Sequence, residues 1–413
     1  MSCVHSAMPA AARHIAPTLT DENSTFNDEG AATTGWTATN GTVAVSGDYL
    51  RLTKTTGAGS NANISKSITF TPSNRDYILY GKLRSSMHHV GDNAVVWILN
   101  GSKEMSFWLG TTDGGSSGPG LATGAASITG TTGAATYNHA QIAAAGALDY
   151  ENTPVEFALQ FDSKFAQLNC WFREGDGRWK LKGRVDCDWF DSPTISIYKG
   201  SLSNANTWVE FDYLTLCQPN LVAIGDSICE GKALFSPDLS LGLDDDESSW
   251  QRHAVPYPAL RNNLIVNKGV GSQTSTQILA RIADATGEAP KVVYIHASTN
   301  DEVGAISQAT RTSNIQSTID AVIAAGAFPV LLNAVYGQQG GADNLPTPDL
   351  RDYMTTWWET YRPTLTGVFQ QVDIMRPIID ANGFTDAAYS AGDGTHLTAT
   401  GYALVADYLV DIS

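Results

Sequence analysis

The sequence predicts two domains, an all-β domain followed by an α/β domain with a parallel sheet. Up to about residue 218, short alternating strands are separated by clusters of Gly, Asn, Asp, Ser and Thr. From about residue 219, near-continuous apolar runs alternate with helical patterns, as in sheets that are buried on both faces. Hydrophobic residues make up 42% of the 413 residues, which is enough to bury a core in each domain.

The N-terminal half is typical of a β-sandwich, and we expect a jelly roll. Its candidate strands alternate apolar and polar residues and recur about every 10 residues. We expect residues 1–22 to be a poorly ordered extension, residues 23–218 to form the sandwich and residues 219–413 to form the α/β domain. The candidate strands include TVAVSGDYLRLTKT, YILYGKLRS, AVVWILNG, VEFALQFD, LNCWFREGDGRWKLKGRV and TWVEFDYLTLC.

A segment rich in Gly, Thr, Ser and Ala interrupts the sandwich between about residues 111 and 148. It is longer than an ordinary connection between strands. We favour a flexible surface loop here, and a binding loop is the alternative.

The C-terminal half alternates strands with helices, which predicts a doubly wound sheet with helices on both faces. Four apolar runs, LVAIGDS, LIVNKGV, VVYIHAS and FPVLLNA, are the candidate strands, and QQVDIM is a weaker fifth. The helical patterns cover residues 274–286, about 305–325, 348–361 and 397–409.

Composition excludes several classes of protein. The net charge of −17, with no local cluster of Lys and Arg, argues against nucleic-acid binding and favours uncharged substrates. No apolar run is long enough to span a membrane. The five cysteines lack zinc-site spacing, and a disulfide or buried free thiols both remain open. The acidic run Asp244–Glu247 lacks the spacing of a calcium loop, so we expect no metal and no other cofactor.

Polar side chains follow the candidate strands at one edge of the predicted sheet. They occur in Gly225-Asp-Ser227, in the turn after Asn267, in Ser298-Thr-Asn-Asp301 and, before the last helix, in Asp393-Gly-Thr-His396. Ligands bind at the carboxyl ends of the strands in open α/β sheets, so we expect these four clusters to meet.

The four clusters contain the groups that a serine hydrolase needs. Ser227 is the candidate nucleophile, at a tight turn where Gly225 permits close approach of backbone and ligand. His396 is the candidate base, and Asp393 is placed to orient it. The candidate oxyanion donors are the N–H of Ser227, an N–H of Gly271 or Ser272, and the Asn300 amide.

Each of these residues also has a structural interpretation. A serine after a strand is often a helix N-cap, and an aspartate or asparagine at a strand end is often a turn residue. The joint occurrence of the four clusters favours catalysis. We expect Asp226, Asp301 and His253 to line the substrate cleft.

The four clusters resemble the ordered motifs of the SGNH hydrolases, also called the GDSL esterase/lipase superfamily. The matching segments are GDS at Ser227, NKGVGSQTS, STND at Asn300 and DGTHLTATGY. The resemblance implies a flavodoxin-like three-layer α/β/α fold and a Ser227–His396–Asp393 triad. The family's oxyanion glycine falls on Ser272, one residue after Gly271, and the first residue of its G-x-N-D motif is Ser298 here.

The function that we expect is hydrolysis of an acyl ester, most simply an O-acetyl group on a carbohydrate. β-Sandwich modules accompany carbohydrate esterases of this superfamily, although tryptophans such as Trp171, Trp179 and Trp189 are more often core residues than sugar platforms. The alternatives are a lipase, arylesterase or acyltransferase, and a glycan-binding protein with an inactive hydrolase domain. We expect an extracellular, cell-surface or phage-associated protein, with a cytoplasmic one as the alternative because the N-terminal segment does not resemble a secretory signal. The oligomeric state is left open.

Overall fold

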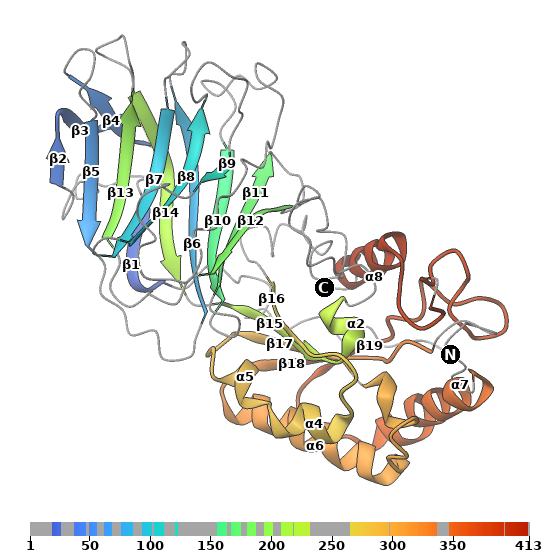
Figure 1. Cartoon of the computed structure of the whole chain (residues 1–413). Helices are drawn as coiled ribbons and strands as arrows, with labels where there is room; N and C mark the ends of the chain where they lie inside the picture. Colours follow the sequence, from blue (N-terminus) through green and yellow to red (C-terminus); the bar gives the residue numbers. More distant parts are fainter. Residues whose placement is uncertain are drawn as a thin grey trace. The chain divides into compact units, whose positions relative to one another are not determined.

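The structure is a computed structural model of the whole chain, shown in Figure 1. The residues that it describes are 19–25, 37–46, 49–55, 62–67, 76–85, 93–100, 103–110, 120–122, 155–162, 167–174, 180–186, 194–200, 208–217, 219–231, 265–296, 298–336, 347–391 and 393–411.

The described residues form two compact units that divide between residues 218 and 219. The first is all-β, and its strands pair antiparallel in two sheets. The larger sheet has the order β12-β11-β10-β6-β14-β4-β3, with β1 also paired to β14, and the smaller has the order β2-β5-β13-β7-β8-β9. The strands of the larger sheet are β1 (Leu19–Thr25), β3 (Gly41–Ser46), β4 (Tyr49–Lys54), β6 (Tyr77–Ser85), β10 (Val155–Asp162), β11 (Gln167–Glu174), β12 (Lys180–Asp186) and β14 (Trp208–Cys217). Those of the smaller sheet are β2 (Thr37–Thr39), β5 (Ala62–Ser67), β7 (Asn93–Asn100), β8 (Lys103–Gly110), β9 (Gly120–Ala122) and β13 (Thr194–Gly200).

The two sheets pack on one another through alternating side chains. Leu50 and Leu52 of β4 and Val209 and Phe211 of β14 are buried, and β4 contacts β5 and β13 of the other sheet. On the opposite face of the larger sheet, Glu210 lies between two arginines of the neighbouring strands and forms an ion pair with each. This alternation confirms the predicted β domain, while the jelly-roll assignment stays a prediction.

Two details of the β unit differ from the expectations. The strand β1 begins at Leu19, inside the segment that we assigned to the N-terminal extension. The short strand β9 lies within the predicted long loop, and the rest of residues 111–148 are outside the described residues.

The second unit is the predicted α/β domain. Its five strands are all parallel, in the order β16-β15-β17-β18-β19, which is the flavodoxin-like order. The strands are β15 (Leu221–Gly225), β16 (Ile265–Gly269), β17 (Val292–His296), β18 (Phe328–Leu332) and β19 (Gln370–Val372). Every residue of β15 and of β17 is buried, because helices cover both faces of the sheet.

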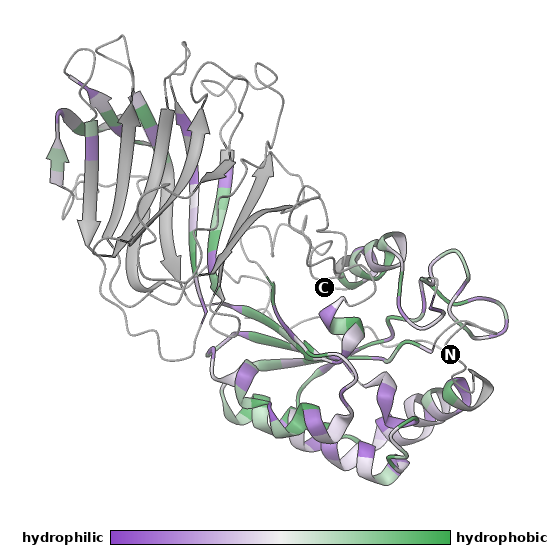
Figure 2. Cartoon of the chain, in the orientation of Figure 1, coloured by the Kyte–Doolittle hydropathy of each residue, from purple (hydrophilic) through white to green (hydrophobic). Residues whose placement is uncertain are grey.

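The helices form the outer layers of this domain. In Figure 1, α4, α5 and α6 lie on one face of the sheet and α2 and α8 on the other. Figure 2 shows apolar residues concentrated on the strands and polar residues on the outer sides of α4 and α6. The helices are α2 (Ser227–Glu230), α4 (Ser275–Ala280), α5 (Ala283–Thr286), η4 (Thr299–Asp301), α6 (Gln308–Ala324), α7 (Thr347–Thr356), η5 (Trp357–Tyr361), η6 (Arg362–Thr364) and α8 (Ala399–Asp411).

The helices lie where the sequence predicts them, but two of them differ in length or in helix type. The pattern over 274–286 forms two short helices, α4 and α5, with a break at Arg281 and Ile282. The pattern over 348–361 is α7 followed by a π-helical turn, η5. Helix α2 has only four residues, which is too short for a periodic pattern that would predict it. None of the described helices is long and apolar enough to cross a membrane.

Candidate active site

Ser227 lies at the first position of α2, directly after the buried strand β15. Asp226 is the N-cap of this helix, and its Oδ1 accepts a hydrogen bond of 3.0 Å from the N–H of Ile228. Ser227 itself is only 7% exposed. The N-cap role that was an alternative for Ser227 therefore belongs to Asp226, and the Ser227 hydroxyl is not used to start the helix.

Gly225 is needed for packing within the protein, which differs from the expected role of admitting a ligand. A Cβ atom at this position would lie 2.6 Å from the Cβ of His296 and 2.8 Å from the Cβ of Cys229. The turn after β15 therefore comes close to β17 only because residue 225 has no side chain.

The Asp226 carboxylate joins the turn after β15 to the turn after β17. Its Oδ2 accepts hydrogen bonds from the N–H of Thr299 at 2.7 Å and from Nδ2 of Asn300 at 3.2 Å. Nδ1 of His296 lies 3.2 Å from its Oδ1. Burial alone would raise the pKa of Asp226, but His296 and the N–H groups of Thr299 and Ile228 lower it below its usual value. Asp226 is therefore an ionised structural group, fully buried, and the expectation that it lines the substrate cleft is wrong.

Asn300 lies in the short helix η4, whose N-cap is Ser298. Its Nδ2 donates to Asp226 and also, at 3.2 Å, to the carbonyl oxygen of Gln273. Both amide hydrogens therefore have acceptors in this state. A substrate oxyanion would have to replace or share one of these two acceptors.

The turn between β16 and α4 carries the other expected oxyanion donors. Ser272 has φ of 62°, in the left-handed region, whereas Gly271 is not among the glycines with positive φ. Left-handed backbone costs a residue with a Cβ roughly 1–2 kcal/mol. Neither the N–H of Gly271 nor that of Ser272 donates a hydrogen bond within the described part of the chain. Both donors remain candidates, and the left-handed position is the one where the sequence resemblance places the oxyanion glycine of the SGNH hydrolases.

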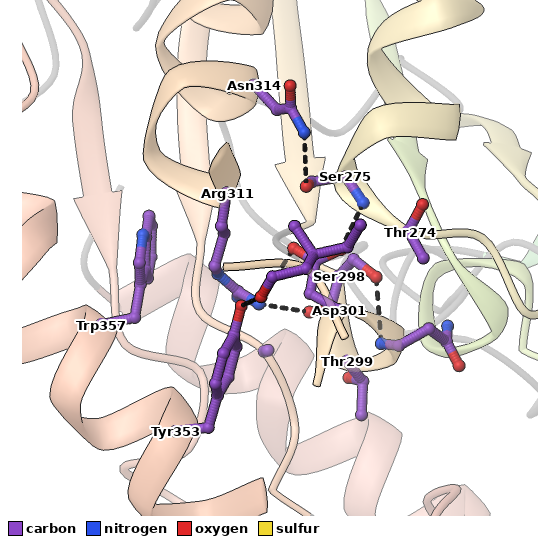
Figure 3. Close-up of polar contacts among 12 residues, drawn as sticks. Thr274, Ser275, Ser298, Thr299, Asp301, Arg311, Asn314, Tyr353 and Trp357 are labelled. Atoms are coloured by element: carbon purple, nitrogen blue, oxygen red, sulfur yellow. Dashed lines mark hydrogen bonds and ion pairs between the residues drawn. The ribbon is translucent and has the colours of Figure 1, made fainter. Parts of the chain in front are cut away.

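Asp301 connects the same turn to helix α6, as Figure 3 shows. Its Oδ1 accepts a hydrogen bond of 2.6 Å from the N–H of Ser275, and its Oδ2 lies 3.2 Å from Nη1 of Arg311. The Asp301 and Arg311 side chains are both fully buried. Burial raises the pKa of Asp301, and Arg311 and Ser275 partly oppose this effect. The expectation that Asp301 lines the cleft is therefore also wrong, because its carboxylate points into the protein.

Arg311 is packed between charged and aromatic groups. Besides Asp301, it donates to the carbonyl oxygen of Ser298 at 2.8 Å. Its guanidinium lies 4.7 Å from the ring centroid of Trp357 and 5.6 Å from that of Tyr353 (Figure 3). These contacts fix the start of the segment that carries Asn300.

Asp393 and His396 form a compact turn before α8. Nδ1 of His396 is hydrogen bonded to Oδ2 of Asp393, and Oδ1 accepts from the N–H groups of Thr395 and His396, each at 3.0 Å. Burial would raise the pKa of Asp393, but these hydrogen bonds and the His396 charge lower it. Nε2 of His396 is buried and has no hydrogen-bond partner within the described residues.

The acid–base turn and the nucleophile turn share one hydrophobic core. Leu397, next to His396, and Ile228, next to Ser227, belong to the same buried cluster as Tyr402 of α8. Burial, together with nearby Asp226, Cys229 and Asp393, raises the pKa of Tyr402. Ser227 and His396, both of which are described, make no direct hydrogen bond with each other in this state.

The remaining expected features fall largely outside this site. His253 and residues 244–247 lie outside the described residues, as do Cys3, Cys187, Trp179 and Trp189. Cys229 is buried and is not part of a disulfide. The described residues contain no cluster of three or more His, Cys, Asp or Glu placed to hold a metal ion.

Comparison with known proteins identifies the domain. The model of the GDSL-like Lipase/Acylhydrolase family matches residues 223–404. The C-terminal unit is a GDSL-like acylhydrolase domain. No curated protein matches the chain.

Several solved structures are similar to this chain. A putative lipolytic protein of the G-D-S-L family from Desulfitobacterium hafniense is 19% identical, with a TM-score of 0.38 and an alignment that covers 47% of this chain and 98% of that one. A catalytic mutant of an acetylxylan esterase from Geobacillus stearothermophilus is 18% identical, with a TM-score of 0.36 and coverage of 46% and 92%. Peanut lectin is 8% identical, with a TM-score of 0.35 and coverage of 48% and 97%. Because these scores are low, the identification rests on the family model.

Sequence reasoning missed the charged residues that support the acylhydrolase site. Arg311 lies on α6, where an arginine is usually expected on the exposed face. Arg281 lies at the break between α4 and α5, and its side chain contacts the ends of β15 and β16. The only sequence signal for either residue is a basic side chain near the predicted site in a domain with few basic residues.

Proposed function

We propose that the acylhydrolase domain is a serine esterase that removes small acyl groups, in particular O-acetyl groups, from a carbohydrate. The observation that carries this proposal is the state of His396. Its Nδ1 is held by Asp393, while its buried Nε2 has no hydrogen-bond partner among the described residues. A neutral imidazole held in this way has its second nitrogen available to accept a proton.

In the proposed mechanism, Ser227 Oγ attacks the ester carbonyl carbon while His396 Nε2 takes the hydroxyl proton. The tetrahedral oxyanion accepts hydrogen bonds from the N–H of Ser227, from the turn at Gly271 and Ser272, and from Asn300. Collapse of this intermediate breaks the bond to the sugar oxygen, which leaves with the proton from His396. A water molecule then attacks the acyl-serine with His396 again as base, releasing the carboxylic acid and free Ser227.

Two features support a small acyl group on an uncharged carbohydrate. Ser227 is only 7% exposed, and a nucleophile so little exposed favours acetyl over long acyl chains. The net charge of −17 disfavours polyanionic substrates. The all-β unit that precedes the catalytic domain would then bind the carbohydrate.

The test is turnover of p-nitrophenyl acetate, butyrate and octanoate, followed by acetate release from acetylated polysaccharides. We expect the highest kcat/KM for acetate and a loss of at least about 10³-fold in the Ser227→Ala variant. Ser390→Ala, which replaces a buried serine outside the proposed catalytic groups, serves as the matched control.

Each alternative function has its own signature in these assays. An increase in kcat/KM with acyl length would replace the deacetylase proposal with a lipase. Equal rates for the wild type and Ser227→Ala would remove Ser227 from the mechanism. Binding of a polysaccharide without turnover of any ester would indicate a glycan-binding protein with an inactive hydrolase domain.

A further inference from the structure

The conformation of Ser272 requires an explanation, because this residue has a Cβ atom and lies in the left-handed region at φ of 62°. Its side chain is exposed, and it forms no hydrogen bond within the described part of the chain. Asn and Asp can offset left-handed strain with local side-chain hydrogen bonds, but Ser272 does not do so here. Contacts of its neighbours must therefore hold the turn.

Gln273, the next residue, is held from two sides. Its side-chain Oε1 accepts a hydrogen bond from Nε of Arg281. Its backbone oxygen accepts hydrogen bonds from Oγ of Ser298 at 2.6 Å and from Nδ2 of Asn300 at 3.2 Å. The backbone that follows Ser272 is thus fixed to the segment after β17 and to the end of α4.

Arg281 is itself anchored to the carboxyl ends of two strands. Its Nη2 donates to the carbonyl oxygen of Gly225 at 2.6 Å, and its Nη1 donates to that of Lys268 at 2.5 Å. The side chain is only 13% exposed. The break between α4 and α5 occurs at Arg281, where the chain leaves the helical path. One guanidinium thus connects the nucleophile strand, the neighbouring strand and the oxyanion turn.

We propose that Arg281, through Gln273, is a positioning residue that holds Ser272 in its left-handed conformation and so keeps the oxyanion turn in place without a glycine. The expected effect of Arg281 on catalysis rests on the proposed function; its effect on the conformation of Ser272 does not. It predicts that the contribution of Arg281 depends on which residue occupies position 272. With glycine at that position, left-handed backbone is not disfavoured, so the turn no longer depends on the contact of Arg281 with Gln273.

The experiment is a double-mutant cycle of Arg281→Met and Ser272→Gly in the full-length protein, with p-nitrophenyl acetate as the substrate. We expect Arg281→Met alone to lower kcat about tenfold with little change in KM, because oxyanion donors act mainly in the transition state. In the Ser272→Gly background, the same substitution should lower kcat by about twofold or less. The difference is a coupling of about fivefold, or about 1 kcal/mol.

Ser272→Ala is the matched control for this cycle. Alanine also lacks the hydroxyl but keeps the Cβ atom, so it should not reduce the effect of Arg281→Met. If Arg281→Met does not yield folded protein, Gln273→Met removes only the acceptor for Arg281 Nε and takes its place in the cycle. Equal losses of kcat in the Ser272 and Ser272→Gly backgrounds, or rescue by Ser272→Ala, would overturn the proposal.

A stability cycle separates this proposal from the proposed function. Ser272→Gly should raise the unfolding temperature of the acylhydrolase domain more in the Arg281 background than in the Arg281→Met background, by roughly 2–4 °C. The entropic effect of glycine on the unfolded chain is the same in both backgrounds and cancels. If no ester is turned over, the proposed function fails, but this measurement still tests whether Arg281 holds Ser272 in its left-handed conformation. Additive effects of the two substitutions on the unfolding temperature would contradict this role of Arg281 even in an active esterase.

Discussion

The two sides of the proposed site, the nucleophile side at Ser227 and the acid–base side at His396, are built in different ways. The turns after β15, β16 and β17 are joined by hydrogen bonds to buried carboxylates. Asp226 accepts from the N–H of Thr299, and Asp301 accepts from the N–H of Ser275. The two partners of each bond lie far apart in the sequence. The Asp393–His396 turn is held by local hydrogen bonds, between residues at most five positions apart. Substitutions on the nucleophile side should therefore change stability and activity together, whereas those on the acid–base side should change activity with little change in stability.

The largest expected effect tests the acid–base side. His396→Gln should lower kcat by about 10³-fold or more, because His396 is the proposed base that receives the Ser227 proton. The free energy of unfolding should change by less than about 1 kcal/mol, because the backbone N–H of residue 396 can still donate to Asp393. Steady-state kinetics and urea unfolding monitored by tryptophan fluorescence measure the two quantities. A large loss of stability would show that this turn is not independent of the rest of the domain.

The second prediction tests the nucleophile side. Arg311→Met removes one partner of a fully buried ion pair and should destabilise the domain by about 3–5 kcal/mol, because the Asp301 carboxylate is left without its charge partner. The activity of the folded fraction should also fall, since Arg311 supports Ser298 and, through it, Asn300.

The double substitution Arg311→Met with Asp301→Asn supplies the control for this prediction. Removal of both charges should recover part of the lost stability, because no uncompensated buried charge remains. Arg351→Met is the matched arginine control, because Arg351 pairs with Asp352 on the surface and should contribute less than about 1 kcal/mol. Equal effects of the two arginine substitutions would contradict the comparison of the two sides.

The same contrast decides what the sequence could predict. The positions of Ser227, Asn300 and His396 follow from the ends of apolar runs and from a short motif, so local patterns were sufficient. The roles of Asp226, Asp301 and Arg311 depend on contacts between elements that are far apart in the sequence. A carboxylate at a strand end looks the same in the sequence whether it faces a cleft or a buried arginine.

Backbone conformation sets a second limit to the sequence prediction. The left-handed φ of Ser272 could not be predicted, because serine is rare in this conformation and its cause lies in Gln273 and Arg281. The helix break at Arg281 could not be predicted either, because the apolar periodicity continues through it. Contacts of Arg281 with the strand ends, rather than a helix-breaking residue, accompany the break.

The smallest expected effect concerns pH and again separates the two sides. Asp226 has a folded pKa below its unfolded value, so its stabilising contribution is present above about pH 4 and is lost as the pH falls through the folded pKa. Asp226→Asn should therefore destabilise the domain by roughly 1.5–3 kcal/mol at pH about 7, and the difference from the wild type should shrink as the pH falls towards about 3.

Urea unfolding at several pH values between about 3 and 7 measures this difference. Asp301, whose pKa is raised by burial and in smaller part by the Asp226 charge, titrates in both proteins, so its opposite contribution cancels only in part. Asp393→Asn is the matched variant on the acid–base side. Its carboxylate is 33% exposed, so solvent screens its interactions and the pH-dependent difference should be smaller than for Asp226→Asn. If the two variants show the same pH dependence, burial of Asp226 does not determine how the free energy of unfolding depends on pH. The long-range contacts of the nucleophile side then contribute no more to stability than the local contacts at His396.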